Sequence, residues 1–195
     1  MKLSAKGFTL IELLIVIAVL GILAVAVLAA INPIEQINRS RDTGSRSDAE
    51  QLIGAIDRFY ASKGYYPWVN SPTSAYTLGW TPVDASWVDD KPSEPTPVLS
   101  KLSQAGTEEI KASFVSRISA SGYNTLYIYN KGVPGSSTYV CFKPKSGSFS
   151  DDAYNRCSAS GGYGTLPSDY PADKACPTDG TCSASNKTGC YSCLP

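Results

Sequence analysis

Hydrophobic positions are concentrated in one block near the N-terminus. All of the 24 residues from Phe8 to Ile31 are apolar except Thr9, Glu12 and Gly21. As an α-helix this block is about 36 Å long at 1.5 Å per residue, which is enough to cross a hydrocarbon core of about 30 Å. A helix also satisfies its own backbone hydrogen bonds in lipid. The pattern therefore predicts a transmembrane helix over residues 8–31.

Basic residues flank this block on its N-terminal side. Lys2 and Lys6 precede it, and no acidic residue occurs among residues 1–7. Positively charged flanking segments remain in the cytoplasm. We therefore expect a single-pass protein of the cytoplasmic membrane, with its N-terminus inside and the residues after Pro33 outside.

A cleaved secretory signal peptide is the first alternative for this segment. The basic start, the apolar middle and Ala24-Val25-Ala26 fit its general pattern. However, the apolar run exceeds the roughly 7–15 residues typical of such peptides, and Glu12 lies in its first turns. An uncleaved signal anchor is the second alternative. Because an ionised carboxylate within a bilayer costs about 3 kcal/mol, Glu12 needs a positively charged partner or access to the cytoplasmic interface.

Helical periodicity continues beyond the membrane segment over residues 32–64. Asn32-Pro33 interrupts the helix, because proline lacks a backbone donor and disfavours helix at the preceding residue. We expect the helix to resume at Ile34, to be weakest over residues 42–45 and to end at Lys63-Gly64. Apolar residues at helical spacing predict that this extension is amphipathic: Ile34, Ile37, Leu52, Ile53, Ile56, Phe59 and Tyr60.

Three arginines of this extension have more than one interpretation. Arg39, Arg41 and Arg46 contact lipid headgroups, or they pair with acidic residues of the same helix, or they form a solvated charged face, which is the interpretation we favour. The acidic candidates are Asp42, Asp48 and Glu50.

The remaining chain predicts an exported globular domain. Residues 65–106 are rich in Pro, Ser and Thr, so we expect an irregular connection whose three tryptophans pack it onto the helix and sheet rather than form an exposed binding surface. Apolar spacing predicts a short helix over residues 108–119. β-Branched and aromatic residues predict an antiparallel hairpin from residues 125–129 and 138–142, with a third or fourth strand from the tail.

Composition excludes several classes of chemistry. The 195 residues include 17 basic and 17 acidic side chains and no histidine. No imidazole is therefore available as a general base, as an activator of Ser or Cys, or as a metal ligand. A formal net charge of zero gives no electrostatic footprint for nucleic acid. We expect no catalysis, no cofactor and no nucleic-acid partner.

Cysteines are confined to the exported side of the chain. An even number there predicts three disulfides, which would stabilise a tail that is poor in apolar residues. The six candidates are Cys141, Cys157, Cys176, Cys182, Cys190 and Cys193. Cys141–Cys157 is the plausible local pair. A zinc site built from the last four is the alternative, although only Cys190 and Cys193 have typical ligand spacing.

Two pairs of adjacent aspartates are candidate calcium ligands. Neither Asp89-Asp90 nor Asp151-Asp152 fits an EF-hand loop. We therefore expect all four to be exposed loop residues.

The residues from Lys6 to Glu12, followed by the apolar run, resemble the prepilin motif. This motif begins type IV pilins, type II secretion pseudopilins and competence pseudopilins. The similarity continues more loosely through residues 48–52 and 59–60 to Gly64-Tyr65-Tyr66-Pro67.

The resemblance implies a processing and assembly pathway. A prepilin peptidase would cut between Gly7 and Phe8, remove the leader 1–7 and methylate the new amine of Phe8. During filament assembly, Glu12 would meet the N-terminal amine of a neighbouring subunit, so that each charge is compensated in a low dielectric. The implied fold is the α+β type IV pilin fold, in which a long N-terminal helix packs on a small antiparallel sheet and a disulfide-rich tail follows.

The sequence thus predicts a structural subunit of a type IV pilus-like filament. Its parts are the leader 1–7, a filament-core helix 8–31, an amphipathic extension 32–64 and an exported domain 65–195 whose Cys-rich tail begins at about residue 141. Its partners would be other pilins in a helical polymer, prepilin peptidase, a membrane assembly platform and cytoplasmic membrane lipid. A pseudopilin of a type II secretion system and a non-polymerising, membrane-anchored binding ectodomain are the alternatives.

Overall fold

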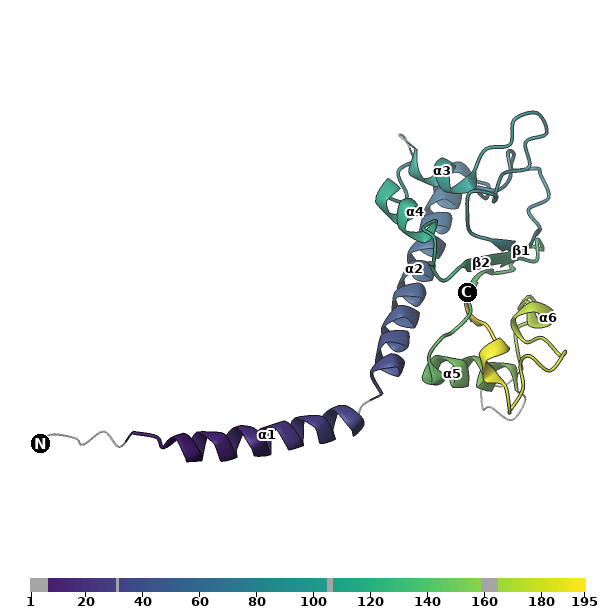
Figure 1. Cartoon of the computed structure of the whole chain (residues 1–195). Helices are drawn as coiled ribbons and strands as arrows, with labels where there is room; N and C mark the ends of the chain where they lie inside the picture. The colour runs from purple at the N-terminus through teal and green to yellow at the C-terminus, as the bar shows by residue number, and fades with distance from the viewer. Residues whose placement is uncertain (1–6, 31, 105–106, 159–164) are drawn as a thin grey trace, which may run out of the picture. The chain divides into compact units, whose positions relative to one another are not determined.

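The computed structural model describes residues 7–30, 32–104, 107–158 and 165–195. The chain divides into two compact units, Met1–Ile37 and Asn38–Pro195. Its elements, drawn in Figure 1, are α1 (Leu10–Ala30), α2 (Pro33–Lys63), β1 (Leu78–Pro82), α3 (Val98–Ser103), α4 (Ala112–Ile118), β2 (Leu126–Asn130), β3 (Thr138–Phe142), α5 (Gly147–Cys157), α6 (Ala172–Ala175), the 3₁₀ turn η1 (Lys187–Gly189) and β4 (Ser192–Leu194).

Helix α2 begins one residue earlier than expected. Pro33 occupies its first position, where the missing N–H costs nothing and the fixed φ suits a helix. The side chain of Asn32 precedes it and accepts a hydrogen bond from the N–H of Glu35 at 3.3 Å, as an N-cap does. Helix α2 then runs without a break to Lys63.

The expectation of a weak stretch at residues 42–45 is wrong. Asp42 and Ser45 are buried within α2, so these polar residues make tertiary contacts instead of loosening the helix. Their low helix propensity is a weak preference that packing overrides.

Four strands form one antiparallel sheet in the order β1-β2-β3-β4. The predicted hairpin is confirmed as β2 and β3, with Ile128 opposite Val140. The tail supplies β4, as expected. Strand β1 comes from the connection that we expected to be irregular, and its register with β2 shifts between Leu78 and Thr81. Proline at its end, Pro82, is compatible with this edge position.

The main core lies between α2 and one face of the sheet. Helix α2 contributes a buried apolar stripe, and β2 and β3 contribute alternate residues. Trp68 and Trp87 from the connection are buried in the same core, which confirms the packing interpretation for these two. Trp80 is only partly buried and stacks on Tyr127, with ring centroids 5.1 Å apart. The stripe and its strand partners are Ala49, Leu52, Ile56, Phe59, Leu126, Ile128, Val140 and Phe142.

Helix α4, which lies beside α2 in Figure 1, is shorter than the predicted helix over residues 108–119. The three apolar residues on which that prediction rested are buried as expected: Phe114 and Ile118 in α4, and Ile110 just before it. The acidic residues before it do not form a first helical turn, because Glu108 has a φ of 42° and Glu109 pairs with Arg58. A left-handed φ at a non-glycine residue is incompatible with continuing the helix.

Candidate functional site

The N-terminus of α1 is closed by a reciprocal set of hydrogen bonds between Thr9 and Glu12. The backbone N–H and the hydroxyl of Thr9 donate to Oε2 of Glu12 at 2.9 and 2.8 Å. The N–H of Glu12 in turn lies 3.3 Å from the Thr9 hydroxyl oxygen, which accepts from it. This is a capping box, in which an N-cap threonine and a glutamate three positions later satisfy free backbone donors. It was not among the features expected from the sequence, although Thr-x-x-Glu before an apolar run is its signature.

The capping box leaves Glu12 with unused acceptor capacity. Both bonds from Thr9 go to Oε2, and among the described residues Oε1 of Glu12 has no hydrogen-bond partner. A carboxylate has about four acceptor positions. Glu12 can therefore keep its local bonds and accept a further donor.

The two residues that flank the Gly7–Phe8 peptide bond are exposed. Gly7 is exposed, and the Phe8 side chain is 83% exposed. A Cβ built on Gly7 would have no other atom within 4 Å. Nothing in the described part of the chain therefore requires glycine at position 7, and a requirement for it would have to come from a partner such as a protease.

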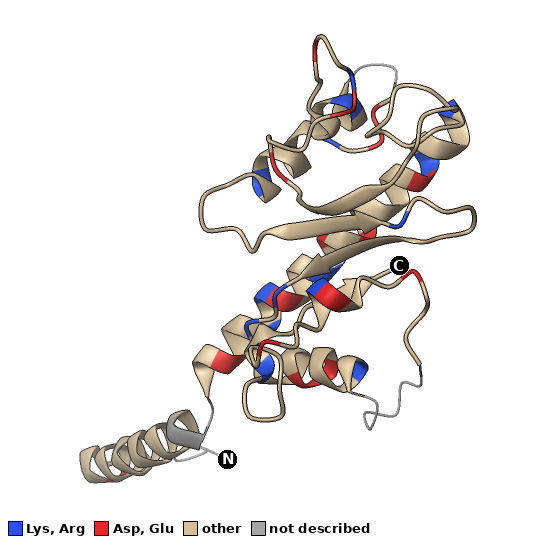
Figure 2. Ribbon diagram, turned by 90° about the vertical axis from the view of Figure 1, so that its right-hand side faces the viewer, with Lys and Arg blue, Asp and Glu red and all other residues tan. Residues whose placement is uncertain are grey.

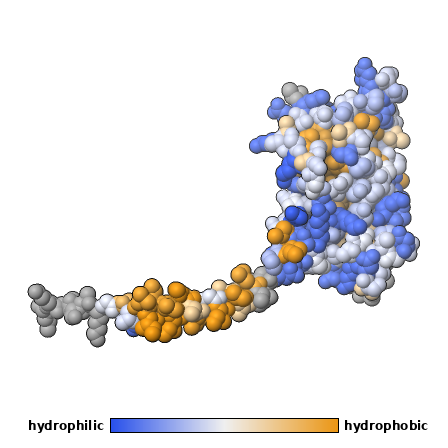
Figure 3. Space-filling model, viewed as in Figure 1, coloured by the Kyte–Doolittle hydropathy of each residue, from blue (hydrophilic) through white to orange (hydrophobic). Residues whose placement is uncertain are grey.

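Helix α1 is apolar around its whole circumference and uncovered. Its side chains are exposed on every face, for example Leu10 at 80% and Ile22 at 72%. The stretch Leu10–Leu28 is long and apolar enough to cross a membrane. Figure 3 shows this helix as hydrophobic along its length, and Figure 2 shows charged residues spread over the ribbons of the second unit while α1 is almost free of them. Such a helix needs lipid or other helices around it.

All six cysteines are paired in three disulfides. The pairs are Cys141–Cys193, Cys157–Cys176 and Cys182–Cys190, with sequence separations of 52, 19 and 8.

The expected pairing of Cys141 with Cys157 is wrong. Cys141 on β3 lies directly opposite Cys193 on β4 in the antiparallel register, so the tail strand brings its partner to it. The structure also replaces the zinc alternative, because a disulfide sulfur offers no thiolate to a metal. Among the described residues, no group of three or more Cys, Asp or Glu side chains is arranged to hold a metal ion.

One of the four candidate calcium ligands is not exposed. Asp89 is buried and lies 2.9 Å from the ammonium of Lys101, whereas Asp90, Asp151 and Asp152 are exposed. The expectation of a loop is wrong for Asp151 and Asp152, which lie in α5. Burial raises the pKa of Asp89, but the hydrogen bonds from Lys101 and from the N–H of Thr96 outweigh it, so its pKa lies below its usual range. This carboxylate thus forms an ion pair with a lysine instead of a free site for calcium.

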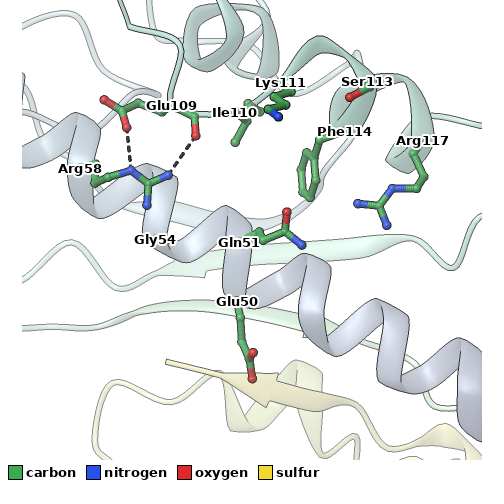
Figure 4. A pocket seen from close by; sticks show the side chains of 10 residues that line it. All are labelled: Glu50, Gln51, Gly54, Arg58, Glu109, Ile110, Lys111, Ser113, Phe114 and Arg117. Atoms are coloured by element: carbon green, nitrogen blue, oxygen red, sulfur yellow. Dashed lines mark hydrogen bonds and ion pairs between the residues drawn. The ribbon is translucent and has the colours of Figure 1, made fainter.

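A groove of about 590 Å³ separates α2 from α4. Figure 4 shows Arg58 bridging one end, where it donates to the Glu109 carboxylate at 2.8 Å and to the Glu109 carbonyl at 2.9 Å. Gly54 lies on its α2 wall, and Lys111 and Phe114 lie on its α4 side. Among the described residues that line it, the groove holds the Arg58–Glu109 ion pair and apolar surface, and no nucleophile is paired to a base.

Comparisons with known proteins match a family model at the N-terminus and find one curated relative over part of the chain. Residues 2–28 match the family described as the prokaryotic N-terminal methylation motif. The chain is 42% identical over 67 residues to the fimbrial protein EcpC of Eikenella corrodens. That match covers 34% of this chain and 42% of the relative, so the chain spans less than half of the relative's length. No solved structure matches the chain.

These matches confirm the resemblance to the type IV pilin family that residues 6–12 predicted. The α+β architecture, the apolar N-terminal helix and the C-terminal disulfides fit the type IV pilin fold. Both matches point to a structural pilin rather than to an enzyme family.

Proposed function

We propose that the chain is a structural subunit of a type IV pilus-like filament. Residues 1–7 are the leader, residues 8–31 anchor the chain in the cytoplasmic membrane and later form the filament core, residues 32–64 extend that helix, and residues 65–195 form the exported surface. Helix α1 supports this most directly. Its apolar side chains are exposed on every face, and it comes directly after the exposed Gly7–Phe8 peptide bond. When such helices pack into a bundle, their apolar surface is removed from water, which stabilises the bundle by about 25 cal/mol per Å² of surface buried.

Processing precedes assembly in this proposal. Prepilin peptidase cuts between Gly7 and Phe8, which removes Lys2 and Lys6 and creates a cationic amine on Phe8. A glycine before the cut presents no side chain to the protease, in agreement with the empty space around Gly7. The assembly platform then extracts the shortened chain from the membrane.

Glu12 determines the register of the neighbouring subunit. Its Oε1 accepts a hydrogen bond from the methylated amine of the neighbour's Phe8, while Oε2 keeps the hydrogen bonds from Thr9. The pair compensates two charges that are expensive in a low dielectric. The apolar faces of α1 supply most of the association energy, so the pair acts mainly on alignment.

Intact-mass measurement of the membrane-embedded chain tests processing. The mature chain should lack residues 1–7 and carry one additional methyl group. An unprocessed Met1, or a cut near Ala26, would contradict the proposal and restore the signal-anchor or signal-peptide alternative.

Two variants test assembly. Glu12→Ala should be cleaved normally but should form few filaments in sheared cell-surface fractions. Thr9→Ala is the matched control, because it breaks the same capping box and leaves the Glu12 carboxylate in place. Filaments from Glu12→Ala in normal amounts, or equal loss in both variants, would remove the carboxylate from the mechanism.

A type II secretion pseudopilin is the second candidate. The Tyr65-Tyr66-Pro67 turn after α2 favours it, whereas three disulfides in an exported tail favour a surface filament. The genes beside this one discriminate between the two: a retraction ATPase indicates a pilus, and secretin and other secretion genes indicate a pseudopilin. A membrane-anchored ectodomain that never polymerises predicts neither filaments nor loss of residues 1–7.

A further inference from the structure

A pocket of about 310 Å³ opens beside α2 and is lined by three cationic side chains. Arg41 comes from α2, Arg117 from the last turn of α4, and Lys145 from the segment between β3 and α5. Gly44 faces the same space and would have no other atom within 4 Å of an added Cβ. The pocket therefore has room for a polyatomic group and has three cationic residues in its lining.

The one carboxylate in the pocket is already neutralised. Asp48 has a side chain that is 2% exposed, and Arg117 approaches both of its oxygens, at 2.8 Å to Oδ1 and 3.1 Å to Oδ2. The hydroxyl of Tyr123 also donates to Oδ2 at 2.6 Å. Arg117 and Asp48 thus cancel each other within the wall of the pocket.

The second carboxylate of this part of α2 accepts its hydrogen bonds from backbone N–H groups and a hydroxyl, not from an arginine. Asp42 is fully buried and accepts bonds from the N–H groups of Lys145 and Ser146 at 2.7–3.0 Å. Arg46 pairs with Glu50 at 3.2 Å. The intrahelical pairing of arginines with Asp42 and Asp48 that the sequence suggested therefore does not occur.

The two other cationic residues that line the pocket, Arg41 and Lys145, are exposed. Neither has an ion-pair partner within the described ranges of the chain. Desolvated phosphate oxygens bind such a pair through charge-assisted hydrogen bonds, and guanidinium matches them in a bidentate manner. With Asp48 set against Arg117, the charged residues that line the pocket carry a surplus of two positive charges.

We propose that this pocket binds the phosphate group of an anionic phospholipid headgroup in the outer leaflet of the cytoplasmic membrane. Arg41 follows Leu28, the end of the apolar span, by 13 residues, and it lies in the third turn of α2. The exposed side chains of Ile34 and Ile37, at 68% and 53%, precede it. Apolar residues followed by basic ones are typical of a segment at the membrane interface. The proposal rests on membrane anchorage by α1 and does not require polymerisation.

Native mass spectrometry of the full chain tests the site. The chain is released from micelles that contain phosphatidylcholine and phosphatidylglycerol in equal amounts, and the lipids that remain bound are counted. The wild-type chain should retain phosphatidylglycerol preferentially. Arg41→Gln/Lys145→Gln should reduce that retention about 30-fold, since each basic residue near an anionic surface contributes a factor of about five.

Lys63→Gln/Lys111→Gln is the matched control. It removes the same charge from two exposed lysines outside the pocket and should leave phosphatidylglycerol retention unchanged. Thermal unfolding of the pocket variant should match that of wild type, because Arg41 and Lys145 are exposed and have no ion pairs to lose.

Three results would overturn the proposal. Equal retention of phosphatidylglycerol by the pocket variant and wild type would remove the site. Displacement of the lipid by inorganic phosphate at the same occupancy would assign the pocket to a soluble anion. Dimers in lipid-free micelles that disappear in Arg41→Gln/Lys145→Gln would assign it to a second copy of the chain. Each result is independent of N-terminal processing, so it can be separated from a failure of the filament proposal.

Discussion

The carboxylate of Asp42 on α2 accepts a hydrogen bond from the hydroxyl of Ser146 at 2.6 Å, although the two residues lie 104 positions apart. Both residues are fully buried. Ser146 is also the N-cap of α5 and accepts a bond from the N–H of Phe149 at 3.4 Å. One carboxylate of the long helix thereby fixes the start of the helix that leads into the disulfide-rich tail.

Replacing Asp42 by asparagine should destabilise the second unit. One amide group cannot accept all the bonds that Lys145 and Ser146 now donate to the carboxylate, and buried donors would lose their partner. We expect the free energy of unfolding to fall by about 2–4 kcal/mol, measured by denaturant titration of the full chain in micelles. Asp57→Asn, at an exposed position of the same helix, should change it by less than about 0.5 kcal/mol; similar losses in both variants would contradict this role.

Lys101 should be essential for the connection that carries the tryptophans. Its ammonium donates to the carbonyls of Pro67 and Val69 at 3.0 and 3.1 Å and to Asp89 at 2.9 Å. Lys101→Met leaves a buried charge without its partner, so unfolding should become easier by about 3 kcal/mol.

The double variant Lys101→Met/Asp89→Asn is the control for Lys101. It removes the uncompensated charge and should recover part of the loss, as non-additivity in a double-mutant cycle. Strict additivity would show that the two side chains do not stabilise each other. Fluorescence of the buried Trp68 and Trp87 reports unfolding of this region.

Acid should lower the free energy of unfolding, because it protonates Asp89 and Asp169. The pKa of Asp89 is lowered by its bonds from Lys101 and Thr96, which outweigh the opposing effect of burial. The pKa of Asp169 is lowered chiefly by the N–H of Ser137. As pH falls below the ordinary Asp value of about 3.9, the unfolded chain binds protons first, and stability is lost towards the lower folded pKa.

Melting temperatures between about pH 6 and pH 2 check this dependence. The wild-type chain should keep its stability in the upper part of the range and lose it in the lower part. Asp89→Asn should be less stable at pH 6 and should show a shallower decline, because one of the carboxylates with a lowered pKa has been removed. A decline of unchanged steepness in Asp89→Asn would exclude Asp89 as a source.

The three disulfides should contribute unequally. In the chain-entropy treatment, the 52-residue separation of Cys141–Cys193 and the 8-residue separation of Cys182–Cys190 correspond to about 4 and about 2.5 kcal/mol. Denaturant unfolding of the two paired Cys→Ala variants should therefore rank them in that order. Peptide mapping without reduction should recover the same pairs, and a Cys141–Cys157 peptide would contradict the structure.

The sequence alone was sufficient wherever one local pattern carried the information. The apolar run of α1 predicts its helix because a membrane-spanning helix satisfies its hydrogen bonds within itself. The β2–β3 hairpin follows from two short β-rich segments joined by a turn. The N-terminal motif predicts the prepilin resemblance because its residues are contiguous. The capping box of Thr9 and Glu12 is likewise a local feature, with a four-residue sequence signature.

Other features depended on residues that only the tertiary structure brings together. The partner of Cys141 was decided by the register of β3 with β4, and strand β1 exists because β2 offers an edge to a segment without its own periodicity. The partners of Asp42 and Asp48 lie 69 to 104 residues away rather than on the same helix. Burial makes these long-range bonds stronger than exposed pairs along a helix. Local spacing therefore could offer Asp42 and Asp48 only as one possible set of partners for the arginines, and of that set Arg46 with Glu50 alone is a pair in the described residues.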